Sequence, residues 1–381
     1  HWEVRDMLSF PELVALDGQL HDTLTLTLYL DGRSENPAWR TAWRRSLKQE
    51  EARLRRALVD APHDEREAFS RDVDALESYM AQRRGALDAP GWLGVVAGGE
   101  VRLDAPLRGT IPTLGSWGRG VALAPYLCSP DADDGAWVVV VDSRAARIFR
   151  CTDDSVHRID TVRTTLHAES VDEPGASRNG KPHPGTRGGV GRDAAERERR
   201  AARGRMLHEL AQHVHALAPL APVFVGGTPQ LVGEAVSAIQ GEGVTRVIEA
   251  LALGARARVN EIARAVREGM AQLRRDADYA LVEEVLRRFA ADELGAAGAA
   301  ACGRALDERS VQMLVLSETL VTAQPEVAEI FVRSAIAQDA EIRVVTGDSA
   351  RRLEESGGAG VLLRFSPFRT PTAVERDLVT V

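Results

Sequence analysis

Cysteine is scarce in this chain of 381 residues, which holds only Cys128, Cys151 and Cys302. They are odd in number, far apart and without a Cys-x-x-Cys pair, which argues against a disulfide framework or a zinc site. Long apolar runs are also missing: a run such as residues 137–141 is far shorter than the roughly 20 residues of a membrane helix. The first ten residues include acids and no apolar signal core. We therefore expect a cytoplasmic protein without a membrane partner.

Signature motifs of nucleotide binding and catalysis are absent as well. The chain has no Gly-x-Gly-x-x-Gly, P-loop, His-Glu-x-x-His or Gly-x-Ser-x-Gly pattern. Residues 225–230, VGGTPQ, follow a predicted strand and fit either an anion-binding turn or a plain glycine turn. His208, His213 and His215 are expected on the surface of one helix. We predict no cofactor, no metal ligands and no catalytic residue.

The length predicts two or three domains in an α/β protein. We place an N-terminal α+β domain at 1–132. Its alternating residues 22–30 predict a half-buried strand, and Trp39, Trp43, Leu47, Leu54 and Leu58 form the apolar stripe of a helix that starts near Pro37. A second helix is expected at 64–84, followed by two short strands. The proline-containing stretch 106–130 is interpreted as a covering segment and linker.

A middle domain at 133–270 is predicted from a different pattern. Its first strand, near 137–141, is almost continuously apolar, as expected of a strand buried on both faces. Two hairpin strands, a long loop, a helix from Asp193 to about Leu217 and further strands follow. The last domain, 271–381, starts in a long charged helix and continues with three helix–strand units, which predicts a small α/β/α domain.

The chain is acidic overall, with a formal net charge of -8, which by itself argues against a nucleic-acid binder. Two segments depart from this balance: residues 40–56 hold seven cations and two acids, and residues 178–205 hold nine cations and three acids. A basic helix face laced with ion pairs is a common surface feature. That interpretation suits 40–56 better than 178–205, because the second segment begins in a glycine-rich loop.

This loop, 168–193, has no periodicity and contains three prolines and six glycines, with its glycine-bearing part at 174–193. Loops of this length in compact domains are usually functional or disordered. Adjacent Gly188 and Gly189 let a backbone approach another surface closely, and flanking arginines suit phosphates. The composition fits an arm that contacts folded RNA, or a surface loop whose charges only make it soluble.

At this loop the chain resembles the class-1 release factors of archaea and eukaryotes and their paralogue Pelota. Their middle domain presents a Gly-Gly-Gln loop just before a long basic helix, and Arg187-Gly188-Gly189 with the following helix occupies the matching place here. The strand near 137–150 is similar to the one that opens that domain. The end of the chain, 304–365, is similar to the family's L7Ae/L30e-like C-terminal domain. The resemblance spans roughly 135–381 and implies the family's three-domain architecture with a mixed-sheet middle domain.

The N-terminal region fits the bacterial branch of this superfamily, which includes a mycobacterial stress-linked group and the ribosome hibernation factor Balon. Val190 stands where the release factors carry the Gln that helps to position water for peptidyl-tRNA hydrolysis, and Val has no hydrogen-bonding side chain. The Asn-Ile-Lys-Ser stop-codon signature is also absent. The resemblance therefore implies a ribosome-binding protein that neither reads stop codons nor hydrolyses peptidyl-tRNA.

The resemblance also implies partners and contact residues. The protein would occupy the vacant A site of the 70S ribosome during hibernation or stress, and its C-terminal domain would face a translational GTPase, elongation factor Tu by analogy. The loop residues expected to contact 23S rRNA are Lys181, His183, Gly185, Arg187, Gly188, Gly189, Val190 and Arg192. On the following helix they are Arg197, Arg200 and Arg203. In the decoding region, next to 16S rRNA, they are Arg40, Arg44, Arg45 and Lys48.

Two other functions remain open at the level of sequence. One is a ribosome-rescue peptidyl-tRNA hydrolase that uses Arg187 or His183 with water in place of Gln. The other is a stress protein that acts independently of the ribosome and whose loop is inert. Salt-sensitive binding to ribosomes separates the last from the other two, because phosphate-driven binding weakens steeply with salt.

Overall fold

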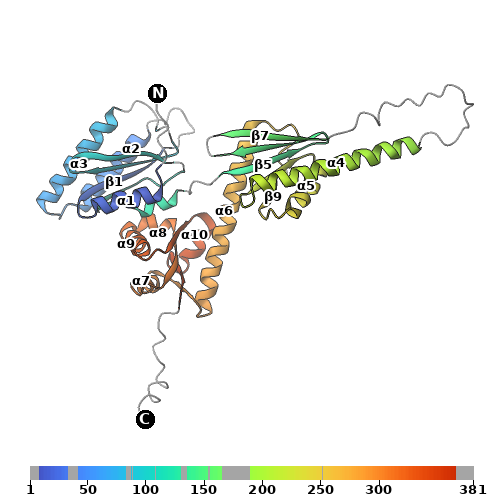
Figure 1. The fold of residues 1–381 in the computed structure, drawn as a ribbon. Coiled ribbons are helices and arrows are strands. Elements are labelled where there is room, and N and C mark those ends of the chain that lie inside the picture. Colours follow the sequence, from blue (N-terminus) through green and yellow to red (C-terminus); the bar gives the residue numbers. More distant parts are fainter. Residues whose placement is uncertain are drawn as a thin grey trace, which may run out of the picture. The chain divides into compact units, whose positions relative to one another are not determined.

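The computed structural model describes residues 8–32, 42–82, 87, 89–107, 109–129, 135–152, 155–164, 189–250 and 252–365. It divides into two compact units. Unit 1 combines residues 1–131 with residues 274–381, and unit 2 comprises residues 132–273. Three sheets flanked by helices make up the described part of the chain (Figure 1). The α/β class predicted from the sequence is confirmed.

The N-terminal part of unit 1 is built on a four-stranded antiparallel sheet with the order β3-β2-β1-β4. Its strands are β1 (Leu24–Asp31), β2 (Gly91–Ala97), β3 (Glu100–Leu107) and β4 (Leu114–Arg119). Its α-helices are α1 (Phe10–Leu20), α2 (Ala42–Ala57) and α3 (His63–Ala81). The predicted stripe Trp43, Leu47 and Leu54 of α2 is buried against α3 and one face of β1, with Leu58 half-buried beside it, whereas Trp39 lies outside the described residues.

The expectation of a half-buried strand at 22–30 is wrong. Thr25 and Thr27 of β1 are as deeply buried as the leucines between them. Segment 121–124 covers the threonine side of the strand, where Thr27 Oγ1 accepts a hydrogen bond from Ala122 N at 3.2 Å. The hydroxyl of Tyr29, on the same side, donates to Ala122 O at 2.6 Å. Threonine tolerates this burial because its hydroxyl finds a partner.

The interpretation of 106–130 as a covering segment and linker is wrong in part. Residues 114–119 form β4, which pairs antiparallel with β1 and completes the sheet. Its sequence, LGSWGR, does not predict a strand, because two glycines lower the β propensity and leave little alternation of apolar and polar residues. The following 3₁₀ helix, η2 (Ala124–Cys128), does act as a cover. It packs on the C-terminal part of unit 1.

Unit 2 is built on a five-stranded mixed sheet with the order β7-β6-β5-β8-β9. Its strands are β5 (Ala136–Val141), β6 (Ala145–Cys151), β7 (Val156–Arg163), β8 (Val223–Gly227) and β9 (Val247–Glu249). β5 pairs antiparallel with β6 and parallel with β8. It is buried on both faces, as its nearly continuous apolar run predicts.

Three helices cover this sheet. Helices α4 (Gly189–Leu217) and α5 (Pro229–Gly241) lie on the face that carries Val139 and Val141. The opposite face, with Val138 and Val140, packs against α6 (Val259–Ala290). Helix α6 begins in unit 2 and ends in unit 1. The alternation of Val side chains in β5 thus supplies two separate cores.

The C-terminal part of unit 1 holds a four-stranded sheet with the order β10-β13-β11-β12. Its strands are β10 (Gly295–Ala297), β11 (Val311–Ser317), β12 (Glu341–Val345) and β13 (Ala359–Leu363). Its further helices are α7 (Ala299–Asp307), α8 (Glu318–Ala323), α9 (Pro325–Ile336) and α10 (Gly347–Glu354). The three predicted helix–strand units are present as α7–β11, α9–β12 and α10–β13. Sequence patterns missed β10 and α8, which are too short to show a period.

One apolar cluster joins the N-terminal and C-terminal parts of unit 1. Tyr29 and Leu93 of the first sheet, Leu123 of the covering segment, and Phe331 and Val332 of α9 all belong to it. We call residues 121–128 the strap, because this segment connects the two sheets. Its packing explains why two regions far apart in sequence form one unit.

Candidate nucleic-acid interface

Helix α4 is anchored to unit 2 by one apolar stripe in its second half. The buried members of this stripe recur at helical spacing and pack on the sheet: Ala202, Met206, Leu207, Leu210, Ala211 and Val214. Before Ala202 the described side chains of the helix are exposed or half-exposed. Figure 1 shows the first half of α4 running past the end of the sheet. The second half of the helix therefore holds the first half out toward solvent.

Arginines dominate this projecting half. Arg197 and Arg200 are exposed, and Arg203 is partly exposed at the point where the buried stripe begins. Arg203 lies 3.6 Å from Glu234 of α5, and Arg205 lies 3.4 Å from Glu198. Such long, solvent-exposed ion pairs are weak and are easily exchanged for other anions. The helix can therefore present its guanidinium groups to a phosphate backbone.

The predicted loop residues Lys181, His183, Gly185, Arg187 and Gly188 lie outside the described residues. Gly189, Val190 and Arg192 form the first turn of α4, and only their backbone is described. The helix thus begins four residues before Asp193, which corrects the predicted loop end at 193. No proline stands between 189 and 193, so the helix extends backwards through the glycines at modest cost.

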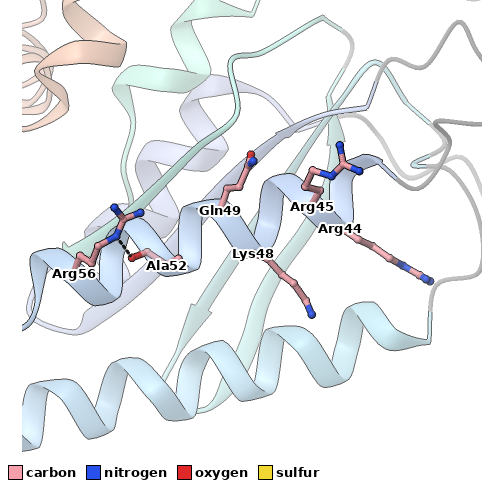
Figure 2. A pocket seen from close by; sticks show the side chains of 6 residues that line it. All are labelled: Arg44, Arg45, Lys48, Gln49, Ala52 and Arg56. Atoms are coloured by element: carbon pink, nitrogen blue, oxygen red, sulfur yellow. Dashed lines mark hydrogen bonds between the residues drawn. The ribbon is translucent and has the colours of Figure 1, made fainter.

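A second basic surface covers the outer face of α2. Burial of Trp43, Leu47 and Leu54 turns the opposite side of the helix to solvent. There a shallow hollow of about 520 Å³ is lined by Arg44, Arg45, Lys48, Gln49, Ala52 and Arg56. Figure 2 shows Arg44 and Lys48 pointing to the same side of the helix. The predicted patch is thereby brought together except for Arg40, which lies outside the described residues.

The acids of α2 do not enter this hollow. Glu50 accepts hydrogen bonds from Arg53 and from the backbone N–H of Gly115, and Glu51 pairs with Arg55. The lining therefore carries four cations and no carboxylate. The Arg44 guanidinium lies 5.2 Å from the Trp43 ring centre, and Arg56 Nε donates to Ala52 O at 3.0 Å. These contacts keep two of the cations close to the helix.

Sequence reasoning left three lining residues out of the predicted site: Gln49, Ala52 and Arg56. Helical spacing could have found them, because they follow Arg45 at intervals of four, three and four residues and so share its face. Gln49 and Ala52 were left out because the prediction followed charge rather than the periodicity of the helix, whereas Arg56 lies in the basic segment 40–56 but was not assigned to the contact.

The described residues of the chain contain no group of three or more His, Cys, Asp or Glu side chains able to hold a metal ion. His208 pairs with Glu242 and His213 with Asp160, each at 3.4 Å on the surface. All three cysteines are buried as free thiols. Burial raises the pKa of Cys128 and of Cys302 to about 12 and that of Cys151 to about 11, which keeps them protonated and unreactive.

The turn VGGTPQ at the end of β8 uses its backbone donors internally. Gly227 N donates to Leu253 O at 2.7 Å, and Thr228 N donates to Val141 O at 2.9 Å. Gly227 also has a φ of 134° and lies so close to Val141 that a side chain would clash. Of the two sequence interpretations, this geometry favours a tight structural turn.

Among the described helices, none combines the length and the apolar character that crossing a membrane requires.

Comparison with known proteins gives structural similarity only, since no family model and no curated protein matches the chain. The Pelota protein of Archaeoglobus fulgidus is 13% identical with a TM-score of 0.39, over 72% of this chain and 79% of that one. An archaeal Pelota in a ribosome-bound assembly with ABCE1 is 12% identical with a TM-score of 0.43, over 95% of both chains. Dom34 of S. cerevisiae, a translation termination-like factor, is 11% identical with a TM-score of 0.39, over 62% of this chain and 64% of that one.

Proposed function

We propose that this protein is a ribosome-binding factor that occupies the vacant A site during hibernation or stress and does not read stop codons. Unit 2 would direct the loop ahead of α4 toward the peptidyl-transferase centre. The α2 surface would meet rRNA in the decoding region. The sequence resemblance to release factors and Pelota motivates this assignment, and the fit of the N-terminal region to the bacterial branch that includes Balon supports a hibernation function.

The observation that carries the proposal is the projecting basic half of α4. Arg197 and Arg200 are exposed, Arg203 makes only a weak pair with Glu234 of α5, and an apolar stripe holds the other half of the same helix on the sheet. A helix with one half packed on the sheet and a projecting basic half suits recognition of RNA by shape and phosphate contacts. Outside α4 and the α2 surface, the acidic balance of the chain disfavours RNA binding.

We propose further that the protein does no chemistry at the peptidyl-transferase centre. The support is Val190, which offers no hydrogen-bonding group where the release factors carry Gln. Val190 also falls in the first turn of α4. The competing function, a rescue peptidyl-tRNA hydrolase that uses Arg187 or His183, makes the opposite prediction for a hydrolysis assay.

Co-sedimentation with vacant 70S ribosomes across a salt series tests the binding. The variant Arg197→Ala/Arg200→Ala/Arg203→Ala removes three cations from α4. If each of these arginines contacts a phosphate, the slope of the logarithm of the ribosome association constant against the logarithm of the salt concentration falls in magnitude by about 2 to 3. A matched control, Arg258→Ala/Arg264→Ala/Arg267→Ala, removes three exposed cations from the same unit and is expected to leave the slope unchanged. No binding by the unaltered protein would overturn the ribosomal assignment, and equal effects of the two variants would exclude α4 as the contact surface.

A hydrolysis assay on ribosomes that carry peptidyl-tRNA then separates the two ribosomal functions. The hibernation proposal expects no release by the unaltered protein. Release that disappears in Arg187→Ala or His183→Ala would identify the rescue hydrolase instead. The variant Val190→Gln asks whether the missing side chain alone prevents the reaction.

We also propose a translational GTPase, elongation factor Tu, as the partner of the C-terminal part. The basis is the resemblance of this part to the family's C-terminal domain. Capture of purified elongation factor Tu by ribosomes only when this protein is present would support the partnership, and capture that is equal without it would exclude the partnership.

A further inference from the structure

The strap of unit 1 is held at its first turn by one carboxylate. Glu329 of α9 accepts hydrogen bonds through Oε2 from Leu123 N at 2.8 Å and from Ala124 N at 3.0 Å. These two N–H groups stand at the start of η2, where a helical turn leaves its donors without internal partners. A side chain 205 residues away in sequence thus caps this turn.

Arg333, one turn further along α9, binds the N-terminal part from the same side. Its Nη1 and Nη2 atoms donate to Asp17 Oδ2 at 2.6 Å and to Asp17 Oδ1 at 2.8 Å, a bidentate pair with α1. Nη2 also donates to Val121 O at 2.8 Å, and Val121 N donates to Asp17 Oδ1 at 2.7 Å. Arg333 therefore contacts the strap both directly and through Asp17.

The third side of this cluster is an ion pair within α9. Arg333 Nε lies 3.1 Å from Glu329 Oε1, an oxygen with no hydrogen bond among the described residues. Asp17 is buried and Glu329 nearly so, and the surrounding side chains belong to the apolar cluster that joins the two sheets. Two carboxylates thus depend on one guanidinium, and loss of that cation would leave buried charges without compensation.

Gly120 shows that the backbone fits this cluster closely. Its φ of 76° lies in the left-handed region, and a Cβ there would stand 2.3 Å from Asp17 Oδ1 and 3.0 Å from Arg333 Nη2. Glycine is the residue that both the conformation and the space allow. The strap therefore turns away from β4 at the position where the charges meet.

We propose that Arg333, Glu329 and Asp17 form an ionic latch, and that the strap is a conformational switch which leaves α8, α9 and β12 when the latch opens while both sheets stay folded. The strap covers an apolar part of the C-terminal sheet and its helices, which includes Leu320, Phe331 and Val344. Opening exposes this surface, and closing hides it.

Hydrogen exchange of Arg333→Gln tests the latch in the full-length protein. The amides of Val121, Leu123 and Ala124, whose acceptors are the latch carboxylates, are expected to exchange at least about tenfold faster than in the unaltered protein. Amides in β2 and β13 are expected to keep their rates. Binding of a fluorescent apolar dye should rise in parallel, because the strap no longer covers the surface beneath it.

Two further variants keep the test decisive. Arg333→Lys retains the charge but not the bidentate fork, and it should give an intermediate rate at the strap even if Arg333→Gln folds poorly. Arg352→Gln removes another interelement arginine of unit 1, which pairs with Glu283 at 3.0 Å, and should leave the strap unchanged. Unchanged strap exchange in both Arg333 variants overturns the latch. Exchange that rises equally in β2 and β13 also overturns it, because the strap would then open only by unfolding.

Discussion

At the scale of single residues, buried polar groups of unit 1 gather where the strap meets β1. Tyr29 is fully buried, and its hydroxyl has one protein acceptor, Ala122 O at 2.6 Å. The side chain combines a large apolar ring with one directional bond. It therefore fixes the position of the strap as well as filling the core.

We predict that Tyr29→Phe lowers the free energy of unfolding of unit 1 by about 1 to 2 kcal/mol, because a buried carbonyl loses its donor while the ring still packs. Chemical denaturation measures the change. Tyr279→Phe is the matched control, since Tyr279 is 51% exposed and should give no measurable loss. Equal losses in the two variants would contradict the assigned role of the hydroxyl.

Glu329 predicts a specific pH dependence. Burial is the largest cause and raises the pKa of this carboxyl above its ordinary value, and the charge of Asp17 raises it further. The N–H groups of Ala124 and Leu123 and the charge of Arg333 lower the pKa but do not cancel the effect of burial. The folded protein therefore holds this proton more tightly than the unfolded chain does. Protonated Glu329 makes its full contribution to the free energy of unfolding below the ordinary glutamate pKa. This contribution is lost as the pH rises through the raised pKa of the folded protein.

The prediction compares the unaltered protein with Glu329→Gln, which cannot ionise. As the pH rises from about 4 to 7, the free energy of unfolding of the unaltered protein should fall relative to that of the variant. Urea titrations at several pH values measure both, and the other carboxyl groups cancel in the difference. A difference that is constant, or that changes in the opposite direction, would refute the raised pKa.

At this scale the sequence predicted surface cations better than buried partners. Arg44, Arg45 and Lys48 were found because a local cluster of charge is visible in the chain. The pair Asp17–Arg333 joins residues 316 positions apart, and no local pattern marks either as buried. Long-range ion pairs of this kind depend on packing that periodicity does not encode.

At the scale of elements, α4 combines a packed half and a projecting half, and Gly204 lies at their junction. No atom outside its own helix and neighbouring residues lies within 4 Å of a Cβ built there, so no packing contact requires glycine. Glycine in a helix interior costs about 0.8 to 1 kcal/mol relative to alanine. The junction is thus a weak point of the helix.

We predict that Gly204→Ala stabilises unit 2 by about 0.5 to 1 kcal/mol, through helix propensity and a less flexible unfolded chain. Gly226→Ala serves as the contrast, because a Cβ at Gly226 would stand 2.5 Å from Leu253 Cβ and should destabilise the same unit. Thermal unfolding of both variants measures the sign. Destabilisation by Gly204→Ala would mean that this position needs glycine for a reason other than space.

Elements with strong periods were predictable, and elements without them were not. The apolar run of β5 and the stripe of α2 agree with their burial. β4 was missed because its glycines weaken the strand pattern, and β1 was assigned one exposed face because threonine is compatible with either environment. The candidate loop stays a prediction from composition and resemblance, because most of it lies outside the described residues.

At the scale of the whole molecule, each unit has cores of its own. Leu210 of α4 and Leu314 of β11 are both fully buried, the first in unit 2 and the second in unit 1. We predict that Leu210→Ala lowers the stability of unit 2 alone and that Leu314→Ala lowers that of unit 1 alone, each by about 2 to 5 kcal/mol. Hydrogen exchange resolved along the chain distinguishes the two. If either variant weakened protection in both units equally, the molecule would unfold as one body.

The discontinuous composition of unit 1 has a consequence for biosynthesis. The first sheet and the strap leave the translating ribosome well before β13, about 235 residues further on, has been made. Synthesis proceeds at about 5 to 20 residues per second, so roughly 10 to 50 s pass before the C-terminal side chains that complete this core are made. During that time Tyr29, Leu93 and Leu123 lack these packing partners. Unit 2, whose residues are contiguous, has the chance to fold during that interval. The nascent chain thus exposes an apolar face that a chaperone would protect until the last strand arrives.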